Sequence, residues 1–172
     1  GTDADVCSQD RGDADGCLVI GAEELDWLSA EALGLYHKNL YSAEGAGALY
    51  LEKSGEGMAL TSPLVEPYQS SKHDSLMSSS LREQILPSIA TVTSLRGIAG
   101  IDRTELALLK NHQAELISPR TLWGEGLSAA TAQQIIIAAE WIQRGKASEA
   151  AVLTVGSNEQ AGYLRVTRTA FS

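Results

Sequence analysis

The most strongly apolar segment of the chain covers residues 127–144 and consists largely of strong helix formers. It contains neither glycine nor proline, and Gly145 follows it as a helix stop signal. Isoleucine, alanine and tryptophan fall on almost every side of this predicted helix, which therefore has hardly any polar face. A helix of this kind is covered on several sides, whereas a surface helix has a charged back. We expect it at the centre of the fold, with sheet packed against it.

Short apolar runs elsewhere predict the strands that cover this helix. A continuous apolar run is typical of a buried strand, and alternation is typical of a half-buried one. The last two runs are joined by a short polar turn, so they must be antiparallel. The pattern predicts strands at residues 17–21, 44–52, 105–110, 115–118, 150–155 and 162–167.

Helices are predicted between these strands. Ser29 is the expected N-cap of a helix over residues 29–36, and a helix over 75–90 is limited at its end by Pro87. Two prolines favour an extended conformation over residues 58–68. Strands that alternate with helices indicate a mostly parallel sheet with helices on its faces. The sequence therefore predicts an α/β fold with a mixed sheet and an antiparallel edge.

Composition and charge restrict the class of protein. The 172 residues fit one domain, and 44% hydrophobic with 20% charged residues is ordinary for a globular chain. A net charge of −9 disfavours nucleic acid and anionic membranes as partners, because both need clustered Lys or Arg. No apolar run approaches the roughly 20 residues of a membrane span. We expect a cytoplasmic protein with an acidic leader at 1–16 and one domain at 17–172.

Cysteines and histidines give little sign of a cofactor or metal. Cys17 opens an apolar strand and is expected to be a small buried residue, while acidic neighbours of Cys7 discourage a reactive thiolate. The sequence does not decide whether these two cysteines form a disulfide. The three histidines show no metal-ligand spacing, and no glycine pattern matches a nucleotide-binding loop. We therefore expect no cofactor and no metal.

Four segments carry a family resemblance. Residues 44–52 read Glu-Gly-Ala-Gly-Ala-Leu-Tyr-Leu-Glu, and residues 118–130 read Ser-Pro-Arg-Thr-Leu-Trp-Gly-Glu-Gly-Leu-Ser-Ala-Ala. Residues 14–24 form an apolar strand, and residues 152–166 form the closing hairpin. In this order they resemble the β-ketoacyl synthase family of the thiolase superfamily, including its E-G-A-G-x-x-x-L-E and K-S-x-x-G-H-x-x-x-A-A stretches. The resemblance implies a thiolase-like mixed sheet with a buried central helix and an antiparallel C-terminal hairpin.

The resemblance also implies which catalytic groups are missing. The family's nucleophilic cysteine lies on a full helix before the strand that starts here at Cys17, and Cys7 is too close to that strand to be its equivalent. His112 resembles the first catalytic histidine in position, at the end of the strand predicted at 105–110. It lacks the Gly-Thr pair that should follow, and the next strand arrives so soon that an intervening helix is expected to be deleted.

Further departures lie in the last two matching segments. The family's second histidine is matched by Glu125, and its lysine by Arg120. The closing hairpin keeps Gly156, while Ser157 stands where the family has a gatekeeper phenylalanine. Gly156 and Ser157 are therefore the candidate substrate-binding residues, and His112 is the candidate catalytic residue.

Glu125 argues against condensation by this chain alone. Decarboxylative condensation needs a thiolate and neutral imidazoles that stabilise an oxyanion, which an ionised Glu125 repels. A carboxylate at a helix N-terminus has a structural explanation, because the helix dipole stabilises it by about 0.3–1 kcal/mol. We expect a non-catalytic partner in acyl-carrier-protein-linked fatty acid or polyketide synthesis, similar to chain-length-factor subunits. The alternative is the C-terminal part of a split or processed condensing enzyme whose nucleophile lies on another chain. The expected partners are an acyl carrier protein or a ketosynthase-type chain, in a dimer or hetero-oligomer.

Overall fold

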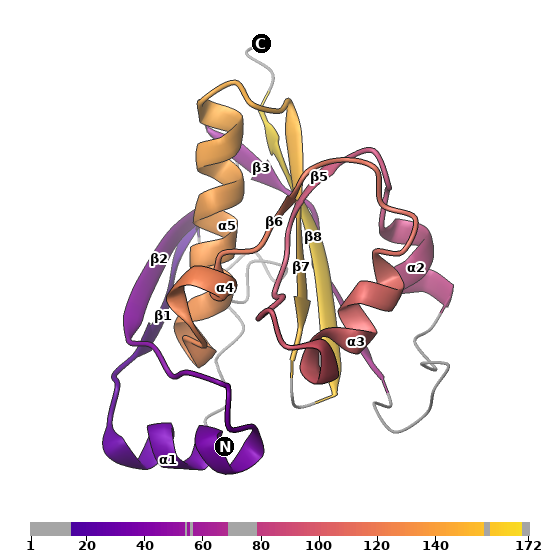
Figure 1. The fold of residues 1–172 in the computed structure, drawn as a ribbon. Coiled ribbons are helices and arrows are strands. Elements are labelled where there is room, and N and C mark those ends of the chain that lie inside the picture. Colours follow the sequence, from indigo (N-terminus) through magenta and orange to yellow (C-terminus); the bar gives the residue numbers. More distant parts are fainter. Residues whose placement is uncertain (1–14, 54, 56, 69–78, 157–158, 170–172) are drawn as a thin grey trace.

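The fold is layered around one long helix, α5 (Leu127–Gln143). The structure is a computed structural model that describes residues 15–53, 55, 57–68, 79–156 and 159–169. A two-stranded sheet packs on one side of α5 and a six-stranded sheet on the other (Figure 1). Helices α2 and α3 lie on the far face of the larger sheet (Figure 1). This arrangement confirms the predicted α/β fold with sheet around a central helix.

The small sheet pairs the first two strands of the chain antiparallel, with Gly21 opposite Gly47. An added Cβ at Gly47 would lie 2.8 Å from Cβ of Ala132, and one at Gly21 would meet the backbone of Ser128. Both glycines are therefore needed for this sheet to approach α5 so closely. The strands are β1 (Gly16–Glu23) and β2 (Gly45–Glu52).

The large sheet is mixed and has the order β3-β8-β7-β5-β6, with β4 also paired to β8. Strand β5 is parallel to both β6 and β7, whereas β7 and β8 are antiparallel. The antiparallel closing hairpin is therefore confirmed, and the extended segment at 58–68 supplies the two strands beside it. The strands are β3 (Met58–Leu60), β4 (Leu64–Pro67), β5 (Ala90–Val92), β6 (Leu116–Ile117), β7 (Glu149–Val155) and β8 (Gln160–Arg168).

Local hydrogen bonds account for several helix ends. Asp26, not Ser29, is the N-cap of α1, because its carboxylate accepts the Ser29 N–H at 2.7 Å. Gly145 ends α5 with φ +68, a conformation that favours glycine, and its N–H donates to the Ile142 carbonyl. The predicted glycine stop is confirmed. The other helices are α1 (Trp27–Tyr36), α2 (Ser79–Gln84), α3 (Ala99–Leu108) and α4 (Arg120–Trp123).

Two sequence predictions between residues 75 and 110 are wrong. Residues 105–108 belong to helix α3, since Asp102, Glu105 and Leu109 are buried at helical spacing. The strand before it is β5, which was not predicted: only Ala90 falls within the helix expected over 75–90, and Thr91 and Val92 were assigned to no element. Helix α2 ends at Gln84, ahead of Pro87. A short apolar run does not distinguish a strand from a helix by its period alone, which explains both errors.

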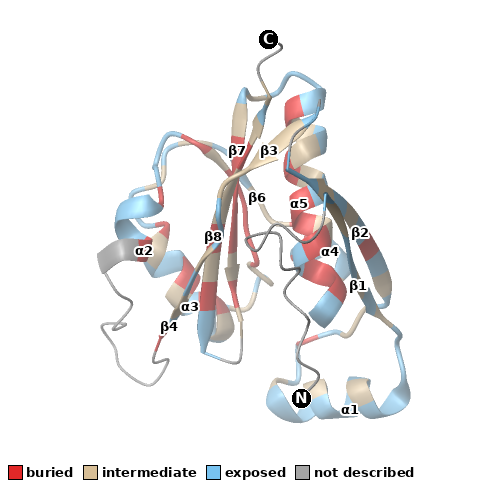
Figure 2. Cartoon of the chain, turned by 180° about the vertical axis from the view of Figure 1, so that it is seen from behind, coloured by how far each residue is buried: buried red, intermediate tan, exposed pale blue. Residues whose placement is uncertain are grey.

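Burial differs sharply between the two sides of α5. Val92, Val152 and Val166 of the large sheet are at most 2% exposed and pack with Ile135 and Ile142 of α5. The strand predicted to be buried at 17–21 is half exposed instead, because only its inner face meets α5 (Figure 2). The leader predicted at 1–16 falls almost wholly on residues outside the described ranges, as does Cys7. No helix of the described residues is long and apolar enough to cross a bilayer.

Candidate functional site

A cavity of about 600 Å³ opens beside the N-terminal end of α5. Its charged part is formed by Arg96, Arg120 and Glu125, while leucine and tyrosine side chains from α1 and the loop after it form an apolar part. Two predicted positions, Glu125 and Gly156, are thereby brought to one cavity. Its wall consists of Ser29, Ala32, Leu33, Tyr36, Leu40, Arg96, Ile101, Arg120, Glu125, Leu127, Thr131, Thr154 and Gly156.

The carboxylate of Glu125 is held between two guanidinium groups. Arg96 Nε lies 2.5 Å from Glu125 Oε2, and Arg120 Nη1 lies 3.0 Å from both oxygens of the same carboxylate. All three side chains are at most 8% exposed. Removing one member of a buried ion cluster leaves a charge without a partner, which is strongly destabilising. The three residues therefore form one structural unit.

The segment around Glu125 is fixed by the start of α5 and by the loop after α1. The Leu127 N–H donates to Glu125 Oε1 at 3.1 Å, so the carboxylate satisfies a free donor of the first helical turn. Gly124 has φ +87, and a Cβ there would lie 2.8 Å from the Tyr41 carbonyl. The Glu125 N–H donates to that same carbonyl at 2.8 Å. These contacts give the carboxylate one position.

A buried glutamine extends the cluster into the sheet. Gln134 Oε1 accepts from Arg120 Nη2 at 3.2 Å and from the Thr154 hydroxyl at 3.1 Å. Its amide donates to the Leu153 carbonyl at 3.3 Å. Burial lowers the pKa of Arg120, and the charge of Glu125 acts in the opposite direction. Nη1 and Nη2 of Arg120 are thus directed at protein acceptors, whereas the buried Nε has no hydrogen-bond partner among the described residues.

A second buried carboxyl group lies next to this cluster. Glu105 accepts the Ser94 N–H at 2.7 Å and the Ser94 hydroxyl at 2.6 Å, and the Val155 N–H donates to that hydroxyl at 2.7 Å. Burial raises the pKa of Glu105 to about 7, although the hydrogen bonds from Ser94 oppose this shift. The network ties helix α3 to the carboxyl ends of β5 and β7.

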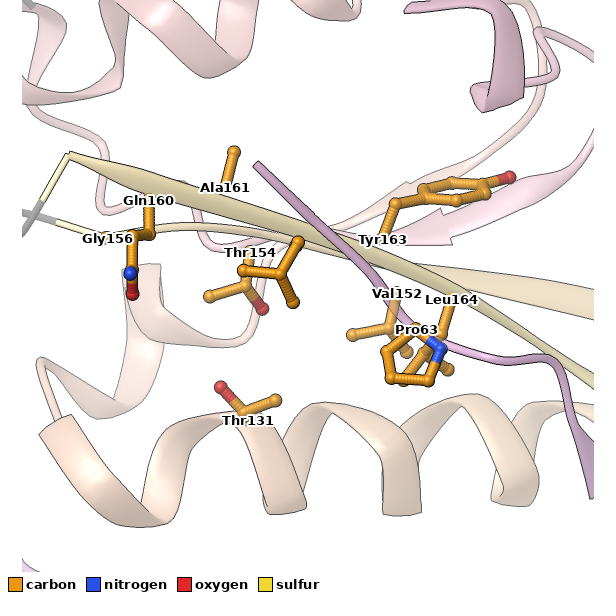
Figure 3. Close-up of a pocket in the computed structure, with 11 residues that line it drawn as sticks. Pro63, Thr131, Val152, Thr154, Gly156, Gln160, Ala161, Tyr163 and Leu164 are labelled. Atoms are coloured by element: carbon orange, nitrogen blue, oxygen red, sulfur yellow. The ribbon is translucent and has the colours of Figure 1, made fainter. Parts of the chain in front are cut away.

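Gly156 lines the central cavity and a second, apolar pocket of about 240 Å³. Figure 3 shows Thr131 of α5 and Thr154 of β7 on facing sides of this pocket, and both threonines also line the central cavity. The Gly156 carbonyl accepts a hydrogen bond from the Tyr68 hydroxyl at 2.6 Å, which fixes the backbone just after β7. Ser157 lies outside the described residues. The two hollows therefore meet at Gly156.

His112 lies away from the central cavity. It follows α3 in a turn and borders a different hollow of about 280 Å³, together with Arg82, Pro87 and Lys110. Burial lowers the pKa of His112, and the backbone of Ile89 acts in the opposite direction. The resemblance of His112 to the family's first catalytic histidine rested on a strand predicted at 105–110. That strand is absent, because residues 105–108 belong to α3. The catalytic role of His112 stays a prediction.

Sequence reasoning missed three members of the site: Ser94, Arg96 and Glu105. They were missed because β5 was not predicted as a strand and the end of α3 was assigned to one. The sequence did contain a signal for a strand that ends at a polar site. It is the hydroxyl-rich segment 91–94, followed by Arg96 and Gly97. No group of three or more His, Cys, Asp or Glu side chains that could hold a metal ion occurs in the described ranges.

Solved structures share this fold. A β-ketoacyl synthase from Burkholderia phymatum STM815 superposes with a TM-score of 0.73 at 13% identity and covers 94% of this chain and 56% of its own. The ishigamide ketosynthase/chain length factor gives 0.66 at 15% identity, covering 94% and 51%. A type II polyketide synthase acyl-carrier protein in complex with its ketosynthase bound to the hexaketide gives 0.63 at 12% identity, covering 93% and 53%.

The chain therefore has the thiolase-like ketosynthase fold and spans about half the length of these solved structures. No family model and no curated protein sequence matches it.

Proposed function

We propose that this chain is a ketosynthase-like component of acyl-carrier-protein-linked fatty acid or polyketide synthesis that does not catalyse condensation on its own. The observation that carries the proposal is the Glu125 carboxylate between Arg96 and Arg120. It stands where the family resemblance places an imidazole. The role that fits best is that of a partner subunit similar to a chain length factor.

The chemistry of the cavity supports a non-catalytic role. An enolate oxyanion needs donors that point at the position where negative charge develops. Here Arg96 and Arg120 donate to Glu125 and to protein acceptors, and the Glu125 side chain occupies the place that the resemblance gives to an imidazole donor. The described residues include one cysteine, Cys17, which lines neither the central cavity nor the apolar pocket. Among the described residues this site therefore has no cysteine nucleophile, and it has guanidinium groups where condensation needs neutral imidazoles.

Decarboxylation of a malonyl-loaded acyl carrier protein tests the lack of catalysis. The protein alone is expected to release no carbon dioxide above the background of the loaded carrier protein. Release that depends on added protein, and that Glu125→Gln alters, would contradict the proposal. Circular dichroism of Glu125→Gln establishes that a change in release does not follow from unfolding.

A role in setting chain length is testable through the apolar pocket. Thr131 lies at the junction of the two hollows, so Thr131→Phe is expected to narrow the path for an acyl chain. In a complex reconstituted with a ketosynthase-type chain, the products should become shorter while turnover stays within about twofold. Ile136→Phe, on the same helix but not lining the pocket, is the matched control. Unchanged product length with Thr131→Phe would remove the pocket from this role.

The alternative function is the C-terminal part of an active split condensing enzyme. It requires a companion chain that carries an alkylatable cysteine, and it keeps His112 as a catalytic residue. In the reconstituted complex, His112→Ala would then abolish condensation, as would iodoacetamide treatment of the companion. Unchanged turnover of His112→Ala would exclude His112 from the mechanism and favour the non-catalytic role. Native mass spectrometry of the untagged protein from its source identifies the companion and the oligomeric state.

A further inference from the structure

The outer face of the small sheet is exposed to solvent and apolar except for Glu52 at one end. Its register places Leu18 opposite Tyr50 and Ile20 opposite Ala48, and these pairs point away from α5. Leu18, Ile20 and Tyr50 are 60%, 64% and 68% exposed. The apolar side chains of the outer face are Leu18, Ile20, Ala22, Ala46, Ala48 and Tyr50.

Folding of the isolated chain does not require the residues of the outer face to be apolar. Successive side chains of a strand alternate between the two faces of a sheet, so residues that need not be buried are free to be polar. In β1 and β2 the inner positions, which include Gly21, Gly47 and Leu49, already supply the contacts with α5. A two-stranded sheet is marginal on its own, and a contiguous apolar patch marks an interaction site.

Acidic side chains border the outer face at both of its ends. Glu24 and Glu44 lie just beyond Ala22 and Ala46, and Asp15 and Glu52 lie at the opposite end. All four residues are exposed. A second copy of this chain would place the same acidic border against this one, and each copy carries a net charge of −9. The charges therefore disfavour self-association and favour a basic partner.

We propose that a companion chain covers the outer face with an amphipathic helix whose aliphatic stripe is flanked by Lys or Arg. The inference deepens the proposed function and rests on it, because it names the surface through which the partner chain binds. A helix fits because the inner face is already packed by one, and helix layers on sheet faces are the usual arrangement in α/β folds. The small side chains of Ala22, Ala46 and Ala48 leave one end of the outer face flat, so that a helix can approach it closely.

A synthetic peptide provides a defined probe for this surface. The probe is a fluorescein-labelled 14-residue peptide of Leu and Lys with all leucines on one helical face, and its counterpart replaces every Lys with Glu. By fluorescence anisotropy, the Leu/Lys peptide is expected to bind saturably and the Leu/Glu peptide at least tenfold more weakly. Ile20→Lys should weaken binding of the Leu/Lys peptide at least tenfold. Leu106→Lys is the matched control, because Leu106 is 47% exposed on α3 and lines neither the central cavity nor the apolar pocket. The affinity of Leu106→Lys for the Leu/Lys peptide should stay within twofold of the parent protein.

Three outcomes would overturn the proposal. Equal losses of affinity in Ile20→Lys and Leu106→Lys would mean attraction to net charge alone. Equal binding of both peptides would mean that the acidic border has no part. A dimer in sedimentation equilibrium that Ile20→Lys dissociates would assign the face to a second copy. Circular dichroism establishes that each variant is folded. If the interface proposal fails, the decarboxylation and product-length tests still apply. Failure of the interface proposal is therefore distinguishable from failure of the proposed function.

Discussion

The two sheets that flank α5 differ in how completely they are buried. In β7 five of seven residues are buried, whereas in β1 none is (Figure 2). Both strands contain a continuous apolar run, so hydrophobicity does not explain the difference. β7 has neighbours on both edges and helices on both faces, while β1 belongs to a sheet with α5 on one face and solvent on the other. The contrast identifies the large sheet as the stable part of the fold and the small sheet as the part with one face open to solvent.

The sharpest test of this contrast is the removal of a side chain from the large sheet. Leu153 of β7 is fully buried in the cluster formed with α2 and α3. Leu153→Ala is expected to lower the free energy of unfolding by about 2–5 kcal/mol, because it leaves a cavity. Urea denaturation followed by circular dichroism measures the loss. A loss below about 1 kcal/mol would mean that the large sheet is not the stable part.

The second test concerns Glu105 of α3, which lies on the large-sheet side of the molecule and whose titration changes the stability of the fold with pH. Its pKa is about 7 in the fold and near 4.5 in the unfolded chain, so between these values the folded state binds one more proton. The contribution of Glu105 to the free energy of unfolding is fully present below about pH 4.5. It decreases by about 3 kcal/mol as the pH rises to about 7.

Glu105→Gln keeps the hydrogen-bond geometry of the protonated acid and removes the titration. The difference in unfolding free energy between Glu105→Gln and the parent protein should therefore change across pH 4.5–7 and be flat outside it. Urea denaturation at a series of pH values measures this difference. A difference that is constant with pH would show that Glu105 titrates alike in both states.

The attachment of the small sheet to α5 is tested at Gly47. An added methyl group would lie 2.8 Å from Cβ of Ala132, so the sheet or the helix must shift. Gly47→Ala is expected to cost about 1–3 kcal/mol through overpacking. Hydrogen exchange should show that protection falls in β1 and β2 and stays unchanged in β7. Equal loss of protection in both sheets would mean that they unfold together.

The smallest effect is expected on the outer face of the small sheet. Leu18 is 60% exposed, so Leu18→Ala should change the free energy of unfolding by less than about 0.5 kcal/mol. Denaturation of the isolated protein measures this change alongside Leu153→Ala. A cost above about 1 kcal/mol for Leu18→Ala would show that the outer face is already covered in the isolated protein.

Prediction from sequence succeeded where periodicity and stop signals were strong. The apolar run of α5, the stop at Gly145 and the polar turn between β7 and β8 each define an element locally. It failed at β5 and α3, which are short and whose identity is decided by tertiary contacts. The position of Glu125 and Arg120 in one site was implied by a family resemblance. Their contact with Arg96 could not be predicted, because Arg96 follows β5, a strand that the local pattern of residues did not indicate.

The attachment of the small sheet to α5 has a consequence for synthesis on the ribosome. Strands β1 and β2 end at Glu52, and the helix against which they pack begins at Leu127. At translation rates of roughly 5–20 residues per second, the small sheet waits about 4–15 s before its packing surface has been synthesised. Throughout this interval both of its faces are open to water. Chaperones that bind apolar segments therefore have their clearest target in residues 16–52 of the nascent chain.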